Sequence, residues 1–177
     1  NISCEFVGHP LLQYKEPSKI DINQAIGKNK ALISIFAGSR ESEINILMPI
    51  LFDFIKLMNK KYTDMTYVFH STKEYAALIK SFINKSDLNN CEVVSDNKIK
   101  SHILQRSVFA VAKSGTISLE ICNLKIPSII IYKMNFINFL IIKNLVKTKY
   151  ANIVNFAADE EIIPELLQSN CNSKNMF

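Results

Sequence analysis

The polar stretch Ser114-Gly115-Thr116 follows an apolar run of strand length at residues 108–112 and precedes a segment of helical period. Its hydroxyls can cap a helix, its glycine lets a ligand approach the backbone, and the N–H groups of a first helical turn favour an anion such as pyrophosphate. Glu120, one turn further, could accept hydrogen bonds from a ribose diol. The stretch indicates either a nucleotide-phosphate site or a plain strand-to-helix turn with a capping residue.

A second polar turn, Gly38-Ser39-Arg40, follows another apolar run at residues 31–36. Arg40 is one of two arginines in a chain rich in lysine, and a guanidinium binds phosphate oxygens through two parallel hydrogen bonds. The alternative is a surface arginine paired with Glu41 or Glu43. Because the chain holds only four glycines, we expect them where only glycine fits, and both turns are expected to open at one edge of a parallel sheet.

Other motifs argue against a metal, a cofactor or a catalytic triad. Neither turn matches G-x-G-x-x-G or G-x-x-x-x-G-K-[ST], and the sequence has no Asp-x-Asp pair to hold Mg²⁺ between phosphates. The prediction is therefore a site without metal or cofactor. His70 and His102 fall at a strand end and a helix start, where a solvated or core histidine is usual. His9 follows Gly8 and either faces a cleft or belongs to a turn.

Alternating apolar runs and amphipathic stretches predict the elements that position these turns. Strands are predicted at residues 31–36, 65–70, 91–95, 108–112 and 127–132. Helices are predicted at residues 41–62, 73–84, 99–106, 116–124, 135–147 and 159–168, with a short one near 20–26. Pro49 is expected to mark a kink or a fresh helix start. Five strands alternating with helices predict an α/β fold with a doubly wound parallel sheet.

Charge, apolar runs and cysteines exclude several classes of protein. The formal charge of +5 comes from lysines spread along the chain without a basic arm, so nucleic acid is not a predicted partner. The sequence shows neither a leader nor an apolar run near the ~18 residues that span a bilayer, which predicts a cytosolic or peripheral domain. Cys4, Cys91, Cys122 and Cys171 lie far apart and predict inert thiols instead of a zinc site or a disulfide framework.

Residues 134–146 carry more apolar surface than a helix with one buried face needs. Phe136 and Phe139 project to one side of the predicted core stripe, and four lysines, Lys133, Lys143, Lys147 and Lys149, border them. This arrangement is typical of a helix that lies against anionic lipid. The alternative is a surface that packs against another domain or a second subunit.

Several motifs taken together resemble one family, the lipid-A-disaccharide synthases, which are inverting glycosyltransferases of the two-domain GT-B type. The matching stretches run in the family's order and spacing: Val7-Gly8-His9-Pro10-Leu11, Gly38-Ser39-Arg40 with Glu43-Ile44, Ser114-Gly115-Thr116 with Leu119-Glu120, Tyr132-Lys133, Leu145-Val146-Lys147 with Tyr150, Asn155, and Pro164-Glu165-Leu166-Leu167-Gln168. The chain departs from the family at Ala37 and Val154, where proline is usual, and at Gln13, where an acidic residue is common.

The resemblance implies that residues 31–168 form the Rossmann-like, UDP-sugar-binding half of a GT-B enzyme. Residues 1–30 would then be a strand end and an inter-domain connection, and residues 169–177 a truncated tail. By the same resemblance, Arg40 helps to hold the donor diphosphate, Gly115 and Thr116 line it, Glu120 meets the ribose and Asn155 reaches the donor site. The other substrate-binding residues that it implies are Gly38, Ser39, Ser114 and Gln168. No catalytic residue is expected in this chain, because the family's general base lies in an amino-terminal domain.

The family joins UDP-2,3-diacylglucosamine to 2,3-diacylglucosamine 1-phosphate and releases UDP. The resemblance therefore implies acylated sugar substrates, an amino-terminal domain and a membrane surface as partners, with a peripheral place on the cytoplasmic face of the inner membrane. The fragment alone is expected to be inactive, since a GT-B site forms between both halves. The alternative is an isolated or decayed UDP-binding module without turnover.

Overall fold

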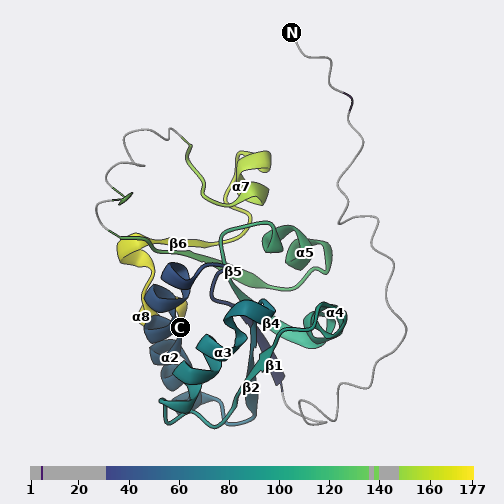
Figure 1. Cartoon of the computed structure of the whole chain (residues 1–177). Coiled ribbons are helices and arrows are strands. Elements are labelled where there is room, and N and C mark those ends of the chain that lie inside the picture. The colour runs from purple at the N-terminus through teal and green to yellow at the C-terminus, as the bar shows by residue number, and fades with distance from the viewer. Residues whose placement is uncertain (1–4, 6–30, 136–137, 140–147) are drawn as a thin grey trace.

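Six parallel strands form one sheet in the computed structural model, which describes Glu5 and residues 31–135, 138–139 and 148–177 (Figure 1). The strands are β1 (Ala31–Phe36), β2 (Met65–His70), β3 (Cys91–Val94), β4 (Ser107–Lys113), β5 (Ser128–Tyr132) and β6 (Glu165–Leu167). Their order across the sheet is β3-β2-β1-β4-β5-β6. The strand order reverses between β1 and β4, and the crevice at that switch point is where such sheets bind ligands.

Helices cover both faces of the sheet (Figure 1). The described helices are α2 (Glu41–Lys61), α3 (Lys73–Asn84), α4 (Asn97–Arg106), α5 (Ile117–Asn123), α7 (Ile153–Ala158) and α8 (Ser173–Met176), with a 3-10 turn η2 at Gln168–Asn170. Buried side chains of α2, α3 and α8 share one core cluster, whereas α4 and α5 contribute to clusters on the opposite face. The predicted doubly wound arrangement is confirmed.

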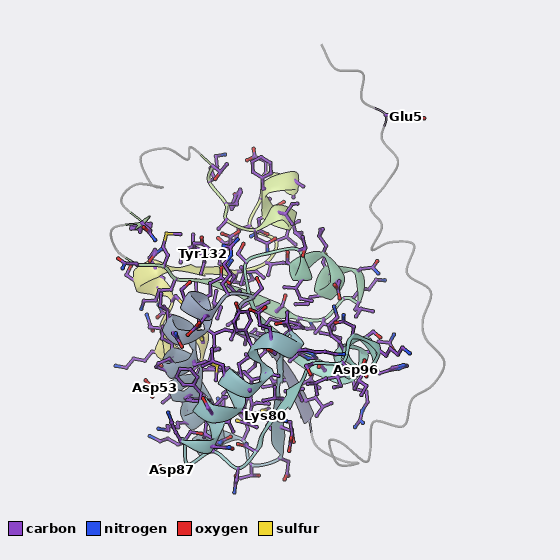
Figure 2. All side chains as sticks on the ribbon, viewed as in Figure 1. Glu5, Asp53, Lys80, Asp87, Asp96 and Tyr132 are labelled. Carbon is purple, nitrogen blue, oxygen red and sulfur yellow. The ribbon has the colours of Figure 1, made fainter. Side chains whose placement is uncertain are left out.

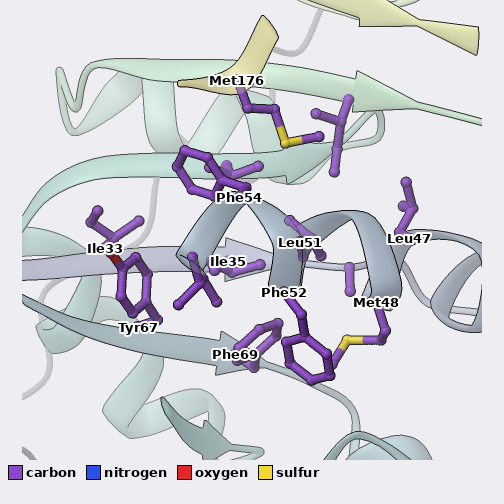
Figure 3. Close-up of a cluster of buried hydrophobic side chains, with 14 of the residues drawn as sticks. Ile33, Ile35, Leu47, Met48, Leu51, Phe52, Phe54, Tyr67, Phe69 and Met176 are labelled. Atoms are coloured by element: carbon purple, nitrogen blue, oxygen red, sulfur yellow. The ribbon is translucent and has the colours of Figure 1, made fainter. Parts of the chain in front are cut away.

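The alternation of side chains along β1 divides the core between these two faces. Ile33 and Ile35 pack against α2, and Figure 3 shows Leu51 and Phe54 of that helix near them. Leu32, the neighbour of Ile33 in the chain, points to the other face and packs against Ile103 of α4. The whole strand is thus covered on both sides, which is why its sequence is a continuous apolar run.

The long helix α2 runs through its proline. Pro49 lies on the exposed side of the helix, which continues without interruption from Glu41 to Lys61, so Pro49 starts no new helix. The buried stripe consists of Ile44, Leu47, Met48, Leu51, Phe52, Phe54 and Ile55. Burial of this stripe, at about 25 cal/mol per Å² of apolar surface, outweighs the single backbone hydrogen bond that proline removes.

The predicted helix at residues 159–168 is wrong. The helix in this region is α7 (Ile153–Ala158), and Asp159, the residue that follows it, has a left-handed φ of +50°. Residues 165–167 form β6 and pair with β5, where Leu166 lies opposite Ile131. Glutamate and leucine favour a helix locally, but pairing along the edge of an existing sheet decides the structure here. The helices and strands from β1 to β5 agree with the prediction to within two residues at each end.

The predicted helices near residues 20–26 and at 135–147 lie outside the described residues, apart from residues 135, 138 and 139. The connection proposed at residues 1–30 lies outside them as well, apart from Glu5. Residues 169–177, expected to be a truncated tail, contain α8, which packs against α2 and buries Cys171 and Met176 in the main core cluster. This segment closes the core over α2. Among the helices that the structure describes, none has the length and apolar content of a membrane span.

Candidate functional site

A cavity of about 830 Å³ opens at the carboxyl ends of β1, β2, β3 and β4, on the switch point of the sheet. Its size is within the range of small-molecule sites. It is lined by Phe36, Gly38 and Ser39 after β1, by residues 70–73 after β2, by residues 95–98 and Lys100 after β3, and by residues 113–117 and Glu120 after β4. Asp96, labelled in Figure 2, caps α4 at the rim, where its carboxylate accepts a hydrogen bond from the Lys98 N–H at 2.7 Å.

Six of the nine residues predicted to bind substrate meet in this main cavity: Gly38, Ser39, Ser114, Gly115, Thr116 and Glu120. They come from turns more than seventy residues apart, which the parallel pairing of β1 with β4 brings together. Arg40 lines a second, smaller cavity beside it. Asn155 and Gln168 line neither of these two cavities.

The capping roles expected of Ser114 and Thr116 are wrong. Thr116 occupies the N-cap position of α5, but its backbone is already helical (φ −62°, ψ −22°) and its side chain makes no capping hydrogen bond. Ser114 Oγ instead donates to the carbonyl oxygen of Ala151 at 2.6 Å. Ser118 also stabilises the turn, because its hydroxyl donates a hydrogen bond to the Gly115 carbonyl at 2.7 Å.

Glu43 connects the two turns of the site. One carboxylate oxygen lies 2.9 Å from Lys113 Nζ at the end of β4, and the other accepts the Ser39 N–H at 3.1 Å. Burial raises the pKa of the Glu43 carboxyl, but the hydrogen bonds from Lys113 and Ser39 and the nearby positive charges outweigh this, so the pKa lies below its usual value. Glu43 therefore stays ionised and fixes the spacing between the β1 and β4 turns.

Gly38 permits this arrangement because of its backbone and its lack of a side chain. Its φ is +116°, a conformation that other residues rarely adopt. A Cβ at this position would lie 2.6 Å from Glu43 Oε2 and 2.8 Å from Glu43 Cβ. The scarcity of glycine in the sequence correctly indicated that this position admits no other residue without strain.

Arg40 lines the second cavity and is not among the residues that line the main one. Its side chain is 78% exposed and its guanidinium lies 3.6 Å from the Glu43 carboxylate, which is the surface pairing weighed as the alternative. An exposed pair of this kind is weak, so the guanidinium is available to a ligand. It borders the second cavity, of about 340 Å³, together with Lys113, Tyr132 and Lys133. Lys113 lines both cavities, and both Lys113 and Arg40 pair with the Glu43 carboxylate.

Glu120 lies on the wall of the main cavity and pairs with Lys100 of α4 at 2.8 Å, both side chains being one quarter exposed. The pairing orients the carboxylate without using all of its lone pairs, so it can still accept a hydroxyl hydrogen. The sequence reasoning identified Glu120 but not Lys100, because nothing in the sequence relates two residues on different helices.

Asn155 is fully buried, and its side-chain amide forms hydrogen bonds with residues of the segment that follows α7. Oδ1 accepts the N–H groups of Ile162 and Ile163 at 3.0 and 2.9 Å, and Nδ2 donates to the Ile163 carbonyl and to Glu165 Oε1 at 2.7 and 2.8 Å. Glu165 also accepts the Ala151 N–H at 2.8 Å, and the Ala151 carbonyl accepts the hydroxyl of Ser114. Asn155 thus reaches the site through Glu165 and Ala151, and direct contact with a donor stays a prediction.

Gln168 follows β6 with a left-handed backbone (φ +51°), and its side-chain oxygen lies 3.5 Å from the backbone N–H of Met134. It therefore supports the segment after β5, near the second cavity. Tyr132, labelled in Figure 2, is the last residue of β5, and Lys113 Nζ lies over its ring, 5.1 Å from the ring centroid. The contact of Gln168 with substrate likewise stays a prediction.

His70, for which the sequence indicates a solvated or core histidine, is a core residue. The side chain is 5% exposed at the end of β2, lines the main cavity and stacks on Phe36 with ring centroids 4.4 Å apart. Burial, reinforced by the positive charge of Lys100, lowers the pKa of His70 to about 3, so its imidazole is neutral.

The described residues include no group of three or more His, Cys, Asp or Glu side chains that could hold a metal ion. Burial raises the pKa of the Cys91 thiol to about 12 and also raises that of Cys171, which agrees with inert thiols at these two positions. Cys122 is exposed, and Cys4 lies outside the described residues.

Solved structures identify the class of this fold. The structure of E. coli ADP-heptose lps heptosyltransferase II superimposes with a TM-score of 0.60 at 6% identity, covering 88% of this chain and 47% of that one. The S. aureus MnaA-UDP co-structure gives a TM-score of 0.52 at 18% identity over 92% of this chain and 43% of that one. The six-stranded parallel sheet with a cavity at its switch point is the Rossmann-like half of a GT-B protein.

The chain belongs to the lipid-A-disaccharide synthetase family, whose model matches residues 1–176. The lipid-A-disaccharide synthase of Rickettsia prowazekii is 33% identical over 96% of this chain, and that of a Sulfurihydrogenibium species is 34% identical over 94%. This chain covers 45% and 46% of the lengths of those two relatives. It spans a little under half of the proteins that it matches.

Proposed function

We propose that this chain forms the donor-binding half of a lipid-A-disaccharide synthase, which joins UDP-2,3-diacylglucosamine to 2,3-diacylglucosamine 1-phosphate and releases UDP. Membership of the family supports the reaction. The observation that supports the site is that Gly38-Ser39 and Ser114-Gly115-Thr116 line one cavity at the switch point of the sheet. The relatives are about twice as long, so the general base and the acceptor are assigned to the remainder of such a protein. Neither the described residues nor the comparisons favour an isolated module without turnover.

In this proposal the diphosphate lies against the Ser114-Gly115-Thr116 turn, whose glycine leaves room for close approach. The Lys113 ammonium, 19% exposed, and the Arg40 guanidinium supply positive charge from the side of the second cavity. The Glu120 carboxylate accepts from the ribose hydroxyls while Lys100 holds it in place. The leaving UDP is stabilised by these cations and donors, and no step in this half requires a proton transfer.

We expect the substitution Arg40→Ala to weaken UDP binding by about 1.5–3 kcal/mol while UMP binding hardly changes, because a charge-assisted hydrogen bond to the second phosphate is lost. Arg40→Lys should restore little, since an ammonium lacks the planar fork. Isothermal titration of the chain with both nucleotides measures the effect. Lys60→Ala, which removes one charge from the far end of α2, is the matched control. Equal losses for UDP and UMP would contradict the diphosphate role.

The acylated substrates lead us to propose a peripheral association with a membrane surface through residues 134–146. Phe139 and, beside this segment, Lys133 are described and partly exposed, whereas Phe136 lies outside the described residues. Each lysine near an anionic surface contributes ~1 kcal/mol, in addition to burial of the aromatic rings.

Vesicle co-sedimentation tests this membrane association. The unmodified chain should bind anionic vesicles more strongly than neutral ones, and a Phe136→Ser, Phe139→Ser variant should bind both weakly. A matched variant carries serine at Phe156, an exposed aromatic on α7. Binding that ignores both lipid charge and the Phe136 and Phe139 substitutions would favour a domain interface instead.

A further inference from the structure

The second cavity, of about 340 Å³, has an excess of positive charge. Among the described residues that line it, the charged side chains are those of Arg40, Lys113, Lys133 and Glu43. Three positive charges against one negative charge leave an excess of two. A phosphate monoester carries a charge of about −1.5 to −2 at pH 7, so its charge complements that of this cavity.

Glu43 orients two of these cations but cannot neutralise both. One of its oxygens, Oε1, lies 2.9 Å from Lys113 Nζ and 3.6 Å from Arg40 Nη1. Two cationic groups thus meet at a single carboxylate oxygen, while the other oxygen accepts the Ser39 N–H. An anion beside Lys113 and Arg40 would supply the negative charge that the single carboxylate lacks.

Lys133 is the third cation, and of the two cavities it lines the second alone. Its Nζ lies 3.4 Å from the carbonyl oxygen of Cys171, and an ammonium has three hydrogens, so donors remain for an anion. Arg40 comes from the turn after β1, Lys113 ends β4 and Lys133 follows β5. These three strands are neighbours in the sheet, so their carboxyl ends bring the cations together.

The second cavity adjoins the proposed diphosphate site. Lys113 lines both cavities, so their nearest walls are no farther apart than the length of one lysine residue. Arg40 and Lys113 can bind two anions at once, because a guanidinium has five N–H donors and an ammonium has three. Lys133 is therefore the residue that distinguishes an anion in the second cavity from a diphosphate in the main one.

The acceptor of the proposed reaction carries a phosphate of this kind. Its phosphate monoester is on the same sugar ring as the hydroxyl that attacks the donor, so it must lie about one sugar ring away from the departing diphosphate. The cavity is also lined by Met134 and Asn138, which belong to the segment proposed to meet the membrane. Basic pockets at a membrane surface bind the phosphates of lipid head groups, which an acylated sugar phosphate resembles.

We infer that the second cavity is a phosphate-monoester site that binds the phosphate of the acylated sugar acceptor, and that Lys133 separates this site from the diphosphate site. The inference rests on the proposed function, which supplies both the acceptor and the neighbouring diphosphate. The half of the enzyme that binds the donor therefore also holds one end of the acceptor.

The test is an amide NMR titration of the isotope-labelled chain, free and saturated with UDP, because NMR detects weak binding and locates it. The ligands are glucosamine 1-phosphate, inorganic phosphate and glucosamine. We expect glucosamine 1-phosphate to bind the free and the UDP-saturated chain with affinities within about threefold, and to shift the amides of Lys133 and Met134. Glucosamine, which lacks the phosphate, should shift neither amide.

The variant Lys133→Gln tests the assigned residue and keeps a donor for the Cys171 carbonyl. Glucosamine 1-phosphate should bind this variant about tenfold more weakly, the usual effect of one charge-assisted hydrogen bond, while UDP binds within about twofold of the unmodified chain. Lys60→Gln, which makes the same charge change at an exposed position of α2, is the matched control and should bind both ligands as the unmodified chain does.

The competition on the unmodified chain decides the matter even if Lys133→Gln does not fold. Displacement of glucosamine 1-phosphate by UDP, or its failure to bind a chain that binds UDP, would overturn this inference and leave the proposed function standing. Equal losses in Lys133→Gln and Lys60→Gln would overturn it as well. Inorganic phosphate that binds as tightly as the sugar phosphate would overturn the acceptor as the occupant. Failure of UDP itself to bind would overturn the proposed function.

Discussion

The substitution Asn155→Ala is expected to lower the free energy of unfolding by about 3 kcal/mol, because it leaves four hydrogen-bonding groups, two of them buried and two partly buried, without their partner. These are the N–H groups of Ile162 and Ile163, the Ile163 carbonyl and a carboxylate oxygen of Glu165. Asn155→Asp should be no milder, since it sets a second carboxylate against Glu165. Urea denaturation followed by circular dichroism measures the loss.

Asn84→Ala, at the exposed end of α3, is the matched control and should unfold at nearly the same urea concentration as the unmodified chain. The experiment also separates the two roles considered for Asn155. If Asn155 only contacts the donor, the variant should bind UDP more weakly while its free energy of unfolding stays unchanged. If Asn155 instead holds its loop, the variant should be less stable. It should also bind UDP more weakly, because Asn155 is linked to the site by way of Glu165, Ala151 and Ser114.

The second large effect is expected at Gly38. Alanine there would adopt a φ of +116°, and its Cβ would lie 2.8 Å from the Cβ of Glu43, which cannot swing aside like the end of a long side chain. Strain of this kind costs about 1–3 kcal/mol, and displacement of Glu43 also disturbs its pair with Lys113. We expect a lower urea midpoint together with weaker UDP binding.

Gly115→Ala provides the comparison, because its Cβ would meet a single atom, the Lys113 carbonyl oxygen, at an ordinary 3.9 Å. Its stability should stay close to that of the unmodified chain, even where a ligand contact is lost. Equal urea midpoints for Gly38→Ala and the unmodified chain would show that the turn relaxes freely and that Glu43 does not constrain it.

The sequence predicts those parts of the fold that local patterns decide. The run at β1 is apolar because both faces are covered, and the amphipathic α3 has a clear helical period, so the sequence places both at their observed bounds. The strand β6 cannot be placed in this way, because Glu165, Leu166 and Leu167 favour a helix locally. Their strand exists only through pairing with β5, which no local pattern reveals.

The residues of the candidate site likewise include some that the sequence predicts and others that depend on tertiary packing. Gly38 and Gly115 can be found because glycine is rare and falls at strand ends, and the turns that contain them do meet. The partners of Glu43 and Glu120, which are Lys113 and Lys100, depend on how distant elements pack. The hydrogen bonds of His70 likewise depend on serines from two other strands. Such side-chain chemistry is a property of the tertiary structure alone.

The packing of α8 on α2 has a consequence for the order in which the chain can fold. The apolar face of α2 is completed by Met176, which a ribosome adds more than a hundred residues later. Contacts of such separation form late, because closing a long loop costs entropy before any contact compensates for it. During synthesis the part of α2 that α8 covers therefore stays exposed until Met176 has been added, a state in which chaperone binding competes with aggregation.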